Sequence, residues 1–410
     1  MMPFHSYTAR ICHNTLQTKG SFILFPASLV FILSVSLFQV PGQNMDAPQP
    51  VHGPTPVVHR PSIILLQFHG LAFGDLSCLG QTQFQTPNFD ELAGEGMTFT
   101  HFTPGTTNPA EAQARFLNCV SYSDQTMPLA SILKSAGYRT GFIGEWPLPG
   151  QPWDQGFDEF AGFLNPDLGT NYYADTFWRR TPKMFYNNMT HNWMEWNPAD
   201  GPNNGGQEMI YQNIQGHQGR YLPDFMFTWV LHFMQDNMPQ WYTGYRPFFL
   251  VVNLPAPRSA APGKDVFPVP TDAPFSDEPW PQPAKNRAAL LTRLDGSIAT
   301  LLQKLRQKGL TNEVAVFLTS SEPPAPYSTP GMGFLQAPED RANTTNSAPL
   351  APMITYWPGV IPAGKTNNEP WQASDFPATA LQIAGCKPVG KISGTSIIPL
   401  LQGHDRPSQP

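Results

Sequence analysis

The stretch at residues 60–80, RPSIILLQFHGLAFGDLSCLG, constrains the fold most strongly. Residues 62–67 are nearly all apolar or β-branched, which is typical of a strand buried in a sheet that is covered on both faces. A turn and a polar loop follow at once, and in α/β enzymes such loops deliver chemistry at the carboxyl edge of the sheet. Here the strand runs into Phe68, His69 and Gly70, where an enzyme usually presents acids. We therefore expect an enzyme-like scaffold whose tip lacks the usual carboxylates.

The composition indicates a globular chain that does not bind nucleic acid. The 410 residues are long enough for one large α/β domain, and 40% of them are hydrophobic. Only 13% are charged, and the 46 prolines predict long irregular loops between the regular elements. The formal net charge is −6 and no basic run is present, which argues against nucleic acid as a partner.

Strand and helix signals alternate along the chain. Helices are expected to start near Pro87 and after Asn108, and to cover residues 127–136, 221–234, 284–308 and 376–383. Strands are expected at 62–67, 97–102, 138–143, 247–253, 313–320 and 353–356. This alternation predicts a three-layer α/β/α sandwich with a mainly parallel central sheet. The aromatic, loop-rich residues 145–218 are expected to be a long insertion packed on the domain, with a lid or binding rim as the alternative.

The N-terminal residues differ from the rest of the chain. Arg10 and Lys19 precede an apolar run at residues 22–38, which begins at Phe22 and ends at Phe38. We expect residues 1–43 to be an export signal and the protein to be secreted or periplasmic. The alternative is an uncleaved membrane anchor formed by that run. Residues 44–59 are predicted to be a Pro-rich linker, 60–403 the folded domain and 404–410 a tail.

The cysteines do not predict a disulfide framework. Cys12 would leave with the signal, so Cys78, Cys119 and Cys386 would remain in the exported chain. Three cysteines at these spacings are expected to be free thiols, buried in the fold.

Several stretches together resemble one family. They run in order from about residue 60 to residue 403: RPSIILL, GLAFGDLSCLGQ, TPNFDELAGEGMTFTHF, LASILKSAGYRTGFIGEW, DQGFDEFAGFLN, NYYADTFWRR, RPFFLVVNLPAP, RLDGSIATLLQKLRQKGL, VAVFLTSS, ITYWPGVIPAG and SDFPATALQIAG. The chain resembles the formylglycine-dependent sulfatases of the alkaline-phosphatase-like superfamily. NYYADTFWRR is most similar to the secreted bacterial arylsulfatases. The resemblance also leads us to expect that a small C-terminal subdomain is shortened or absent.

The resemblance implies a chemistry that this sequence does not reproduce. Family members bind calcium, and in them a cysteine in the motif C-x-[PA]-x-R is oxidised to formylglycine, whose hydrate attacks sulfur. The paired aspartates of the calcium site fall on His69 and Gly70, and its downstream Asp-Asn pair falls on Ser321 and Glu322. Calcium prefers several hard oxygen ligands, which these residues do not supply. Neither calcium nor formylglycine is therefore expected as a cofactor, and we predict no metal site.

The nucleophile and the cationic positions are replaced as well. The family cysteine falls near Pro109 and its arginine near Gln113, while Cys119 lacks the motif. The remaining family positions map to other side chains: the lysine to Glu145, the first histidine to Pro147, the second histidine to Arg258 and the late lysine to Arg341. Asp75 matches the family, and we interpret it as a cap of local structure.

Three functions remain open from the sequence. The favoured one is a catalytically degenerate sulfatase, a pseudoenzyme that retains the ability to bind a ligand or partner, because the chemical positions are lost together while the scaffold signals persist. The second is a sulfuric-ester or phosphoester hydrolase rebuilt from His69, Glu145, Arg258 and Glu322, although Glu145 and Arg258 are more simply expected to pair with each other. The third is a binding module for sulfated or otherwise anionic glycans that uses Arg258, Arg341 and the aromatic insertion.

Overall fold

The computed structural model describes residues 60–122, 125–165, 168, 172–181, 184–187, 192–195, 206–237, 246–258, 266–322, 350–386 and 391–405. These residues belong to one compact unit, Val58–Pro410. The predicted export signal, the linker and Arg341 lie outside the described residues, so those predictions remain untested. None of the helices in the described part is both long and apolar enough to cross a membrane.

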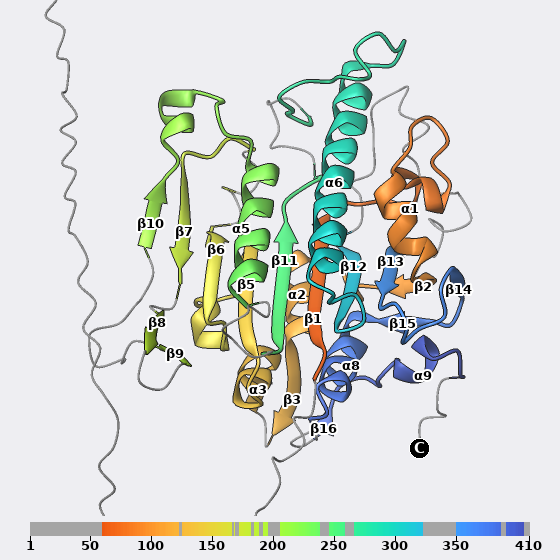
Figure 1. The fold of residues 1–410 in the computed structure, drawn as a ribbon. Coiled ribbons are helices and arrows are strands. Elements are labelled where there is room, and N and C mark those ends of the chain that lie inside the picture. Colours follow the sequence, from red (N-terminus) through yellow and green to blue (C-terminus); the bar gives the residue numbers. More distant parts are fainter. Residues whose placement is uncertain are drawn as a thin grey trace, which may run out of the picture. The chain divides into compact units, whose positions relative to one another are not determined.

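One large mixed sheet forms the centre of the unit (Figure 1). Its strand order is β10-β7-β6-β5-β11-β1-β12-β13-β2-β14, and β15 also pairs with β2. The strands of this sheet are β1 (Ser62–His69), β2 (Met97–Thr103), β5 (Arg139–Glu145), β6 (Glu159–Phe163), β7 (Thr176–Arg180), β10 (Gly206–Met209), β11 (Phe248–Leu254), β12 (Val314–Glu322), β13 (Ala351–Tyr356), β14 (Lys365–Asn367) and β15 (Trp371–Gln372). Two small sheets contain β16 (Lys391–Ile392), β3 (Asn118–Tyr122) and β4 (Gln125–Pro128) in one, and β8 (Met184–Asn187) and β9 (Asn192–Glu195) in the other.

The centre of the large sheet is parallel, as predicted, and its flanks are not. Strands β6, β5, β11, β1 and β12 are parallel neighbours. On one side β7 is antiparallel to β6, and on the other β13 is antiparallel to both β12 and β2. The six predicted strands are all present within a few residues of their expected bounds. The carboxyl ends of the parallel strands therefore meet at one edge.

Helices cover both faces of this sheet, which confirms the three-layer α/β/α architecture. In β1, Ile64, Leu66 and Phe68 point to one face and Ile63 and Leu65 to the other, as the period of a strand requires. The first face packs against α1 (Pro87–Gly94), α5 (Leu222–Asn237) and α6 (Gln282–Gln307), and Figure 1 shows α5 and α6 in front of the sheet. The second packs against α2 (Pro109–Leu117), α3 (Leu129–Ser135), α8 (Phe376–Ile383) and α9 (Ile398–Leu401).

The helix predicted at residues 127–136 starts later than expected. Residues 127 and 128 belong to β4, and α3 begins at Leu129. Pro128 has extended backbone angles, φ −66° and ψ 136°, and a residue that precedes proline is itself disfavoured in the helical region. The amphipathic pattern was correct for α3, but proline decided where it could begin.

The thiols of Cys78 and Cys386 are free and partly buried, as predicted. Burial, with the nearby charge of Asp90, raises the pKa of Cys78 to about 12, so this thiol stays protonated at neutral pH. The side chain of Cys119 lies outside the described residues.

Glu159 at the start of β6 makes the stability of the fold dependent on pH. Burial raises the pKa of Glu159 to about 7, although Arg139 and a hydrogen bond from Asn237 Nδ2 at 3.4 Å act in the opposite direction. Between the ordinary pKa of 4.5 and about 7, the folded state keeps a proton that the unfolded state releases. This group therefore stabilises the fold below the ordinary pKa, and its contribution falls as pH rises, by at most about 1.4 kcal/mol per pH unit.

Replacing Glu159 with Gln should remove this contribution. We expect Glu159→Gln to have a higher free energy of unfolding than the wild-type protein at pH 8, and the difference to shrink as the pH approaches 5. Urea denaturation of both proteins at the two pH values measures the difference directly. A difference that is the same at pH 5 and pH 8 would contradict the assignment.

Candidate active site

Several of the predicted site residues lie at the carboxyl edge of β5, β11, β1 and β12. His69 is the last residue of β1 and is paired in register with Glu322 of β12. Asn253 of β11 is in register with Gln67 of β1 and with Gly144 of β5. These registers place the ends of four strands beside one another.

Asn253 connects the predicted residues of two strands. His69 is fully buried, and its Nε2 lies 2.9 Å from Asn253 Oδ1. The Nδ2 atom of Asn253 donates to the Glu145 carbonyl oxygen at 2.7 Å. Because the amide nitrogen is used in that bond, its oxygen is the acceptor and His69 Nε2 carries the proton. His69 therefore acts as a hydrogen-bond donor inside the fold.

Glu145 and Arg258 form an ion pair, which confirms the simpler expectation for these two residues. Arg258 Nη2 lies 2.6 Å from Glu145 Oε2, and the two side chains are 20% and 1% exposed. The Arg258 carbonyl oxygen accepts a hydrogen bond of 2.6 Å from the Tyr172 hydroxyl. Glu145, which we predicted to stand in the place of the family lysine, is thus neutralised by a neighbouring guanidinium.

Gly144 allows strands β5 and β11 to lie close together at this edge. It has a φ of +118°, which favours glycine, and a Cβ at this position would lie 2.0 Å from the Asn253 carbonyl oxygen. A side chain would therefore push β5 away from β11, and the hydrogen bond between Asn253 and Glu145 depends on this approach.

A buried arginine on α6 holds the loops that follow β1 and β11. Arg287 donates to both carboxylate oxygens of Asp75, at 3.0 and 2.6 Å, and both side chains are almost completely buried. It also donates to the carbonyl oxygens of Gly70, at 3.0 Å, and of Pro257, at 2.9 Å. Asp75 in turn accepts from the Ala72 N–H at 2.6 Å, so it does cap local structure, as interpreted, and also balances the charge of Arg287.

Gly70 and Ser321 have structural roles at the end of β1. Gly70 has a φ of +74°, a conformation that glycine adopts without strain. Ser321 is the extra residue of a β-bulge opposite Phe68 and His69, and its hydroxyl donates to the Phe68 carbonyl oxygen at 3.4 Å. The Ser320 hydroxyl donates to the same oxygen at 3.1 Å and accepts from the Leu71 N–H at 3.1 Å.

Helix α2 carries the positions expected for the nucleophile and its arginine, and it packs against β12. Asn108 caps the helix through the N–H groups of Ala110, at 2.9 Å, and Glu111, at 3.3 Å. Pro109 is the first helical residue, where its missing N–H costs nothing. Gln113 is fully buried, and its side-chain amide has no hydrogen-bond partner among the described residues.

The structure does not unite all of the predicted residues. Pro147 follows β5 as a partly exposed residue. The side chain of Glu322 and the whole of Arg341 lie outside the described part of the chain. Among the residues whose side chains are described, no group of three or more His, Cys, Asp and Glu residues is arranged to hold a metal ion.

Two residues that matter at this edge were not singled out from the sequence. Asn253 had a usable signal, because it ends the apolar run PFFLVVN with a polar side chain. Arg287 had none, since an arginine in a long amphipathic helix is ordinarily exposed. Its burial depends on Asp75, which is 212 residues away in the sequence.

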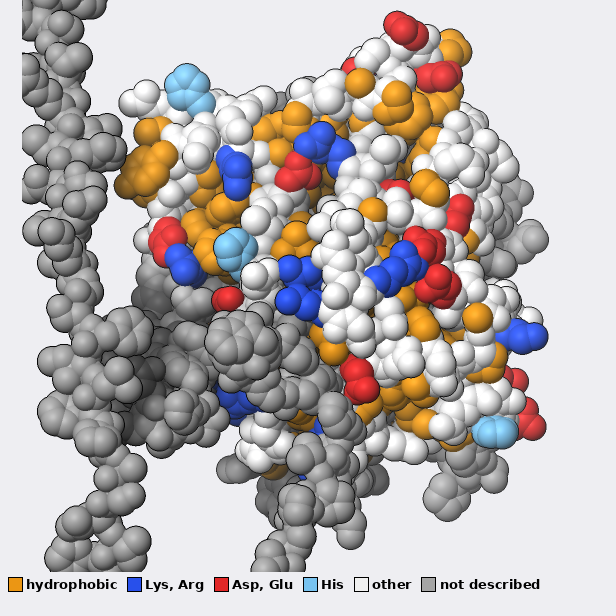
Figure 2. Space-filling model, viewed as in Figure 1, with side chains coloured by type: hydrophobic (Ala, Val, Ile, Leu, Met, Phe, Trp, Pro, Cys, Tyr) orange, Lys and Arg blue, Asp and Glu red, His pale blue; other side chains and the backbone are white. Residues whose placement is uncertain are grey.

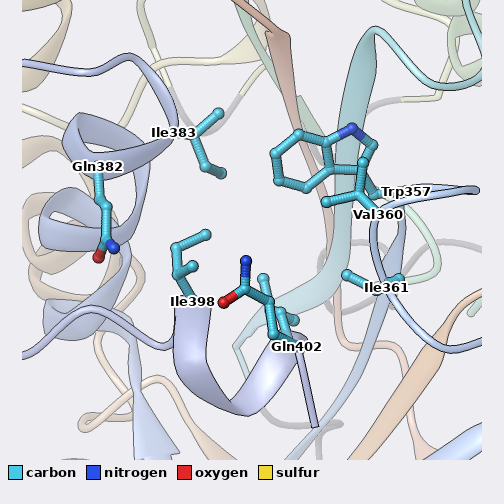
Figure 3. Close-up of a pocket in the computed structure, with 8 residues that line it drawn as sticks. Trp357, Val360, Ile361, Gln382, Ile383, Ile398 and Gln402 are labelled. Atoms are coloured by element: carbon cyan, nitrogen blue, oxygen red, sulfur yellow. The ribbon is translucent and has the colours of Figure 1, made fainter. Parts of the chain in front are cut away.

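A separate cavity of about 190 Å³ lies away from this edge (Figure 3). Trp357 and Val360 line one side, and Ile383 of α8 and Ile398 of α9 line the other. None of the predicted site residues contributes to it.

The chain was compared with families and with known proteins. A family model described as "Sulfatase" matches residues 61–386. The N-acetylgalactosamine-6-sulfatase of Canis lupus familiaris is 25% identical over 395 residues, which cover 85% of this chain and 67% of that protein. Arylsulfatase A of Homo sapiens is 26% identical over 379 residues, covering 85% and 69%.

A solved structure resembles the fold at low sequence identity. It is described as BT4656 in complex with its substrate D-glucosamine-2-N,6-O-disulfate. The TM-score is 0.58 at 17% identity, and the match covers 84% of this chain and 81% of that one.

Breaking the ion pair of Arg287 and Asp75 should lower the stability of the fold strongly. Asp75→Asn leaves a buried guanidinium without its counter-charge, and we expect a loss of about 3–5 kcal/mol in the free energy of unfolding. A matched control is Glu91→Gln, which removes a carboxylate from the exposed ion pair with Arg306 and should cost about 0–1 kcal/mol. Urea denaturation measures both. Equal losses in the two variants would refute the proposed role of Arg287.

Proposed function

Since this chain belongs to the sulfatase family, we propose that it is a catalytically degenerate member, which keeps the fold and has lost the ability to hydrolyse sulfate esters. The observation that carries the proposal is the ion pair between Glu145 and Arg258 at the carboxyl edge of the sheet. Groups that catalyse the cleavage of a sulfate ester must face the substrate. Here the carboxylate of Glu145 and the guanidinium of Arg258 face each other instead.

The residues at the position of the family's calcium site do not fit a calcium ion. Calcium takes about six to eight oxygen ligands, most of them carboxylates and carbonyls. His69 offers an imidazole, which already donates to Asn253. The Gly70 carbonyl oxygen accepts a hydrogen bond from the cationic side chain of Arg287. A cation and a guanidinium would compete for the same oxygen, so we derive no catalytic step that uses a metal at this position.

The positions of the nucleophile also lack the required chemistry. Pro109 has no nucleophilic atom, and the amide of Gln113 carries no charge to stabilise an anion. Both residues have clear structural settings, because Pro109 starts α2 and Gln113 is buried in the interior. These substitutions leave the fold intact and remove the groups that a formylglycine-type mechanism needs.

Turnover assays and metal analysis of one preparation test the proposal. We expect no release of p-nitrophenol from p-nitrophenyl sulfate or p-nitrophenyl phosphate above a blank without protein. We also expect no stoichiometric calcium, zinc or manganese by elemental analysis. An active relative of the family, prepared in the same way, serves as the positive control.

The same assay decides between this proposal and a rebuilt hydrolase. Turnover that disappears in Glu145→Ala or His69→Ala would overturn the proposal and establish the alternative, in which these residues act as acid and base. The ion pair and the hydrogen bond to Asn253 favour the degenerate site, because both side chains are already engaged.

A second candidate function is binding of an anionic glycan at this edge. Arg258 remains 20% exposed despite its pairing with Glu145, and a guanidinium suits sulfate or carboxylate groups. One structural neighbour is described in complex with a sulfated glucosamine. A likeness of fold does not transfer a ligand, so this candidate rests on Arg258.

A glycan array that contains sulfated, carboxylated and neutral oligosaccharides tests the second candidate. We expect acidic glycans to be retained and this retention to fall at least about tenfold in Arg258→Ala, because a charge-assisted hydrogen bond is lost. Retention of neutral and acidic glycans to the same extent would exclude it.

A further inference from the structure

A polar cavity of about 330 Å³ lies beside the amino end of α5. Tyr173, residues 218–221, the first turns of α5 and Arg293 of α6 line it. None of the candidate residues at the carboxyl edge of the sheet, which we call the edge site, lines this cavity. Its size falls in the range of small-molecule sites, which begins at about 300 Å³.

One wall of this cavity holds the guanidinium of Arg220, which pairs with no carboxylate of the described residues. The Arg220 side chain lies over the ring of Phe225, with its Cζ 5.3 Å from the ring centroid. In the part of the chain that the structure describes, Arg220 has no carboxylate partner. Its backbone is held on both sides by the buried side chain of Asn213, which accepts from the Arg220 N–H at 2.7 Å and donates to its carbonyl oxygen at 2.8 Å. The cation is therefore anchored at its backbone and exposed at its tip.

Two further donors in the same cavity are unused. The Tyr221 side chain is 5% exposed, and its hydroxyl has no hydrogen-bond partner among the described residues. Burial raises the pKa of Tyr221 well above its ordinary value, so the hydroxyl keeps its proton. The Nε of Arg293 also has no acceptor within the described part, although Arg293 Nη2 pairs with Asp224. Buried polar groups without partners are rare in native proteins and call for an explanation.

The space at this site is larger than a single small ion needs. Asp224, Thr228 and Arg293 line this cavity and also a neighbouring one of about 320 Å³ between α5 and α6. The neighbouring cavity is bordered by Ser297 and Thr300, whose hydroxyl groups suit contacts with polar ligands. Figure 2 shows this face of the molecule with basic and acidic side chains interspersed.

We propose that this cavity binds an acidic sugar, whose sulfate or carboxylate group contacts Arg220 and the free donors of Tyr221 and Arg293, while its ring lies in the groove toward Ser297. Arginine provides the planar donors that such anionic groups prefer. The carboxylate of Asp224 does not oppose this, since Arg293 already neutralises it. The inference goes beyond the proposed loss of catalysis and does not depend on it.

Tyr172 links a residue that lines this cavity, Tyr221, to Arg258 at the carboxyl edge of the sheet. Its ring stacks on that of Tyr221, with centroids 5.8 Å apart, while its hydroxyl donates to the Arg258 carbonyl oxygen. The two sites are therefore neighbours with different cations. Binding at the cavity must therefore be measured in a variant that lacks the guanidinium of Arg258.

Binding is measured by titration calorimetry in the full chain that carries Glu145→Gln and Arg258→Gln. This pair of changes removes both charges of the edge site at once and keeps the two side chains polar, so no unpaired charge is left buried. The probes are glucosamine-2-N,6-O-disulfate, glucuronic acid, neutral glucosamine with its amine acetylated, and inorganic sulfate. The first two distinguish a sulfate ester from a carboxylate as the group recognised.

We expect at least one of the two acidic sugars to bind and the neutral sugar not to bind. Arg220→Gln in this background should weaken binding by about tenfold or more, because a charge-assisted contact is lost. Tyr221→Phe should weaken it severalfold without lowering the stability of the fold, since the hydroxyl has no partner to lose. Arg306→Gln removes the same charge from the exposed ion pair with Glu91 and should leave binding unchanged.

Four results would overturn the proposal. The first is that neither acidic sugar binds. The second is that Arg306→Gln weakens binding as much as Arg220→Gln, which would indicate a general effect of charge. The third is that inorganic sulfate binds as tightly as the sugars, which would indicate a simple anion site. Loss of binding in the double variant, with binding in the wild-type chain, would assign the sugar to the edge and also overturn it.

Discussion

The guanidinium of Arg287 organises the edge of the sheet where the candidate site lies. It extends from α6 into the interior and binds the carboxylate of Asp75 together with the carbonyl oxygens of Gly70 and Pro257. Those groups belong to the loops that follow β1 and β11. A charge so deeply buried is tolerated only because its partners satisfy it, and their positions are therefore tightly restricted. The loops that would serve catalysis in an active enzyme are held here by a structural contact.

The polar groups at the tips of the strands form a second, connected network. Asn253 joins His69 of β1 to the backbone of β5, and Glu145 at the end of β5 joins Arg258 in the loop after β11. Each of these bonds uses a group that would otherwise be available to a ligand. The polar groups at this edge are thus satisfied by internal hydrogen bonds and an ion pair, which is the physical basis for proposing a degenerate sulfatase. The cavity beside α5 differs in this respect, because two of its donors, the Tyr221 hydroxyl and the Arg293 Nε, have no partner among the described residues.

Much of this arrangement was predictable because it depends on short-range patterns. The apolar runs that became β1, β11 and β12 predicted a buried parallel centre, and the expected pairing of Glu145 with Arg258 was correct. The start of α3 was predicted two residues too early, because the apolar period of the helix outweighed the local effect of Pro128. Asn253 ended a predicted strand and had a readable signal, whereas Arg287 resembled any exposed cation on a long helix. The antiparallel flanks were not foreseen, since local periodicity does not reveal the direction of a neighbouring strand.

The sequence by itself determined the class of fold and the family resemblance, and it predicted that His69, Gly70, Pro109 and Gln113 stand where the family has its chemical groups. These are statements about which residue types occur in which order, and they need no coordinates. Only the tertiary structure decided what the remaining polar side chains do. Whether a carboxylate such as Asp75 or Glu145 serves a ligand or an internal partner depends on which distant residue lies within about 3 Å of it, and chain folding alone brings Arg287 and Arg258 to that distance.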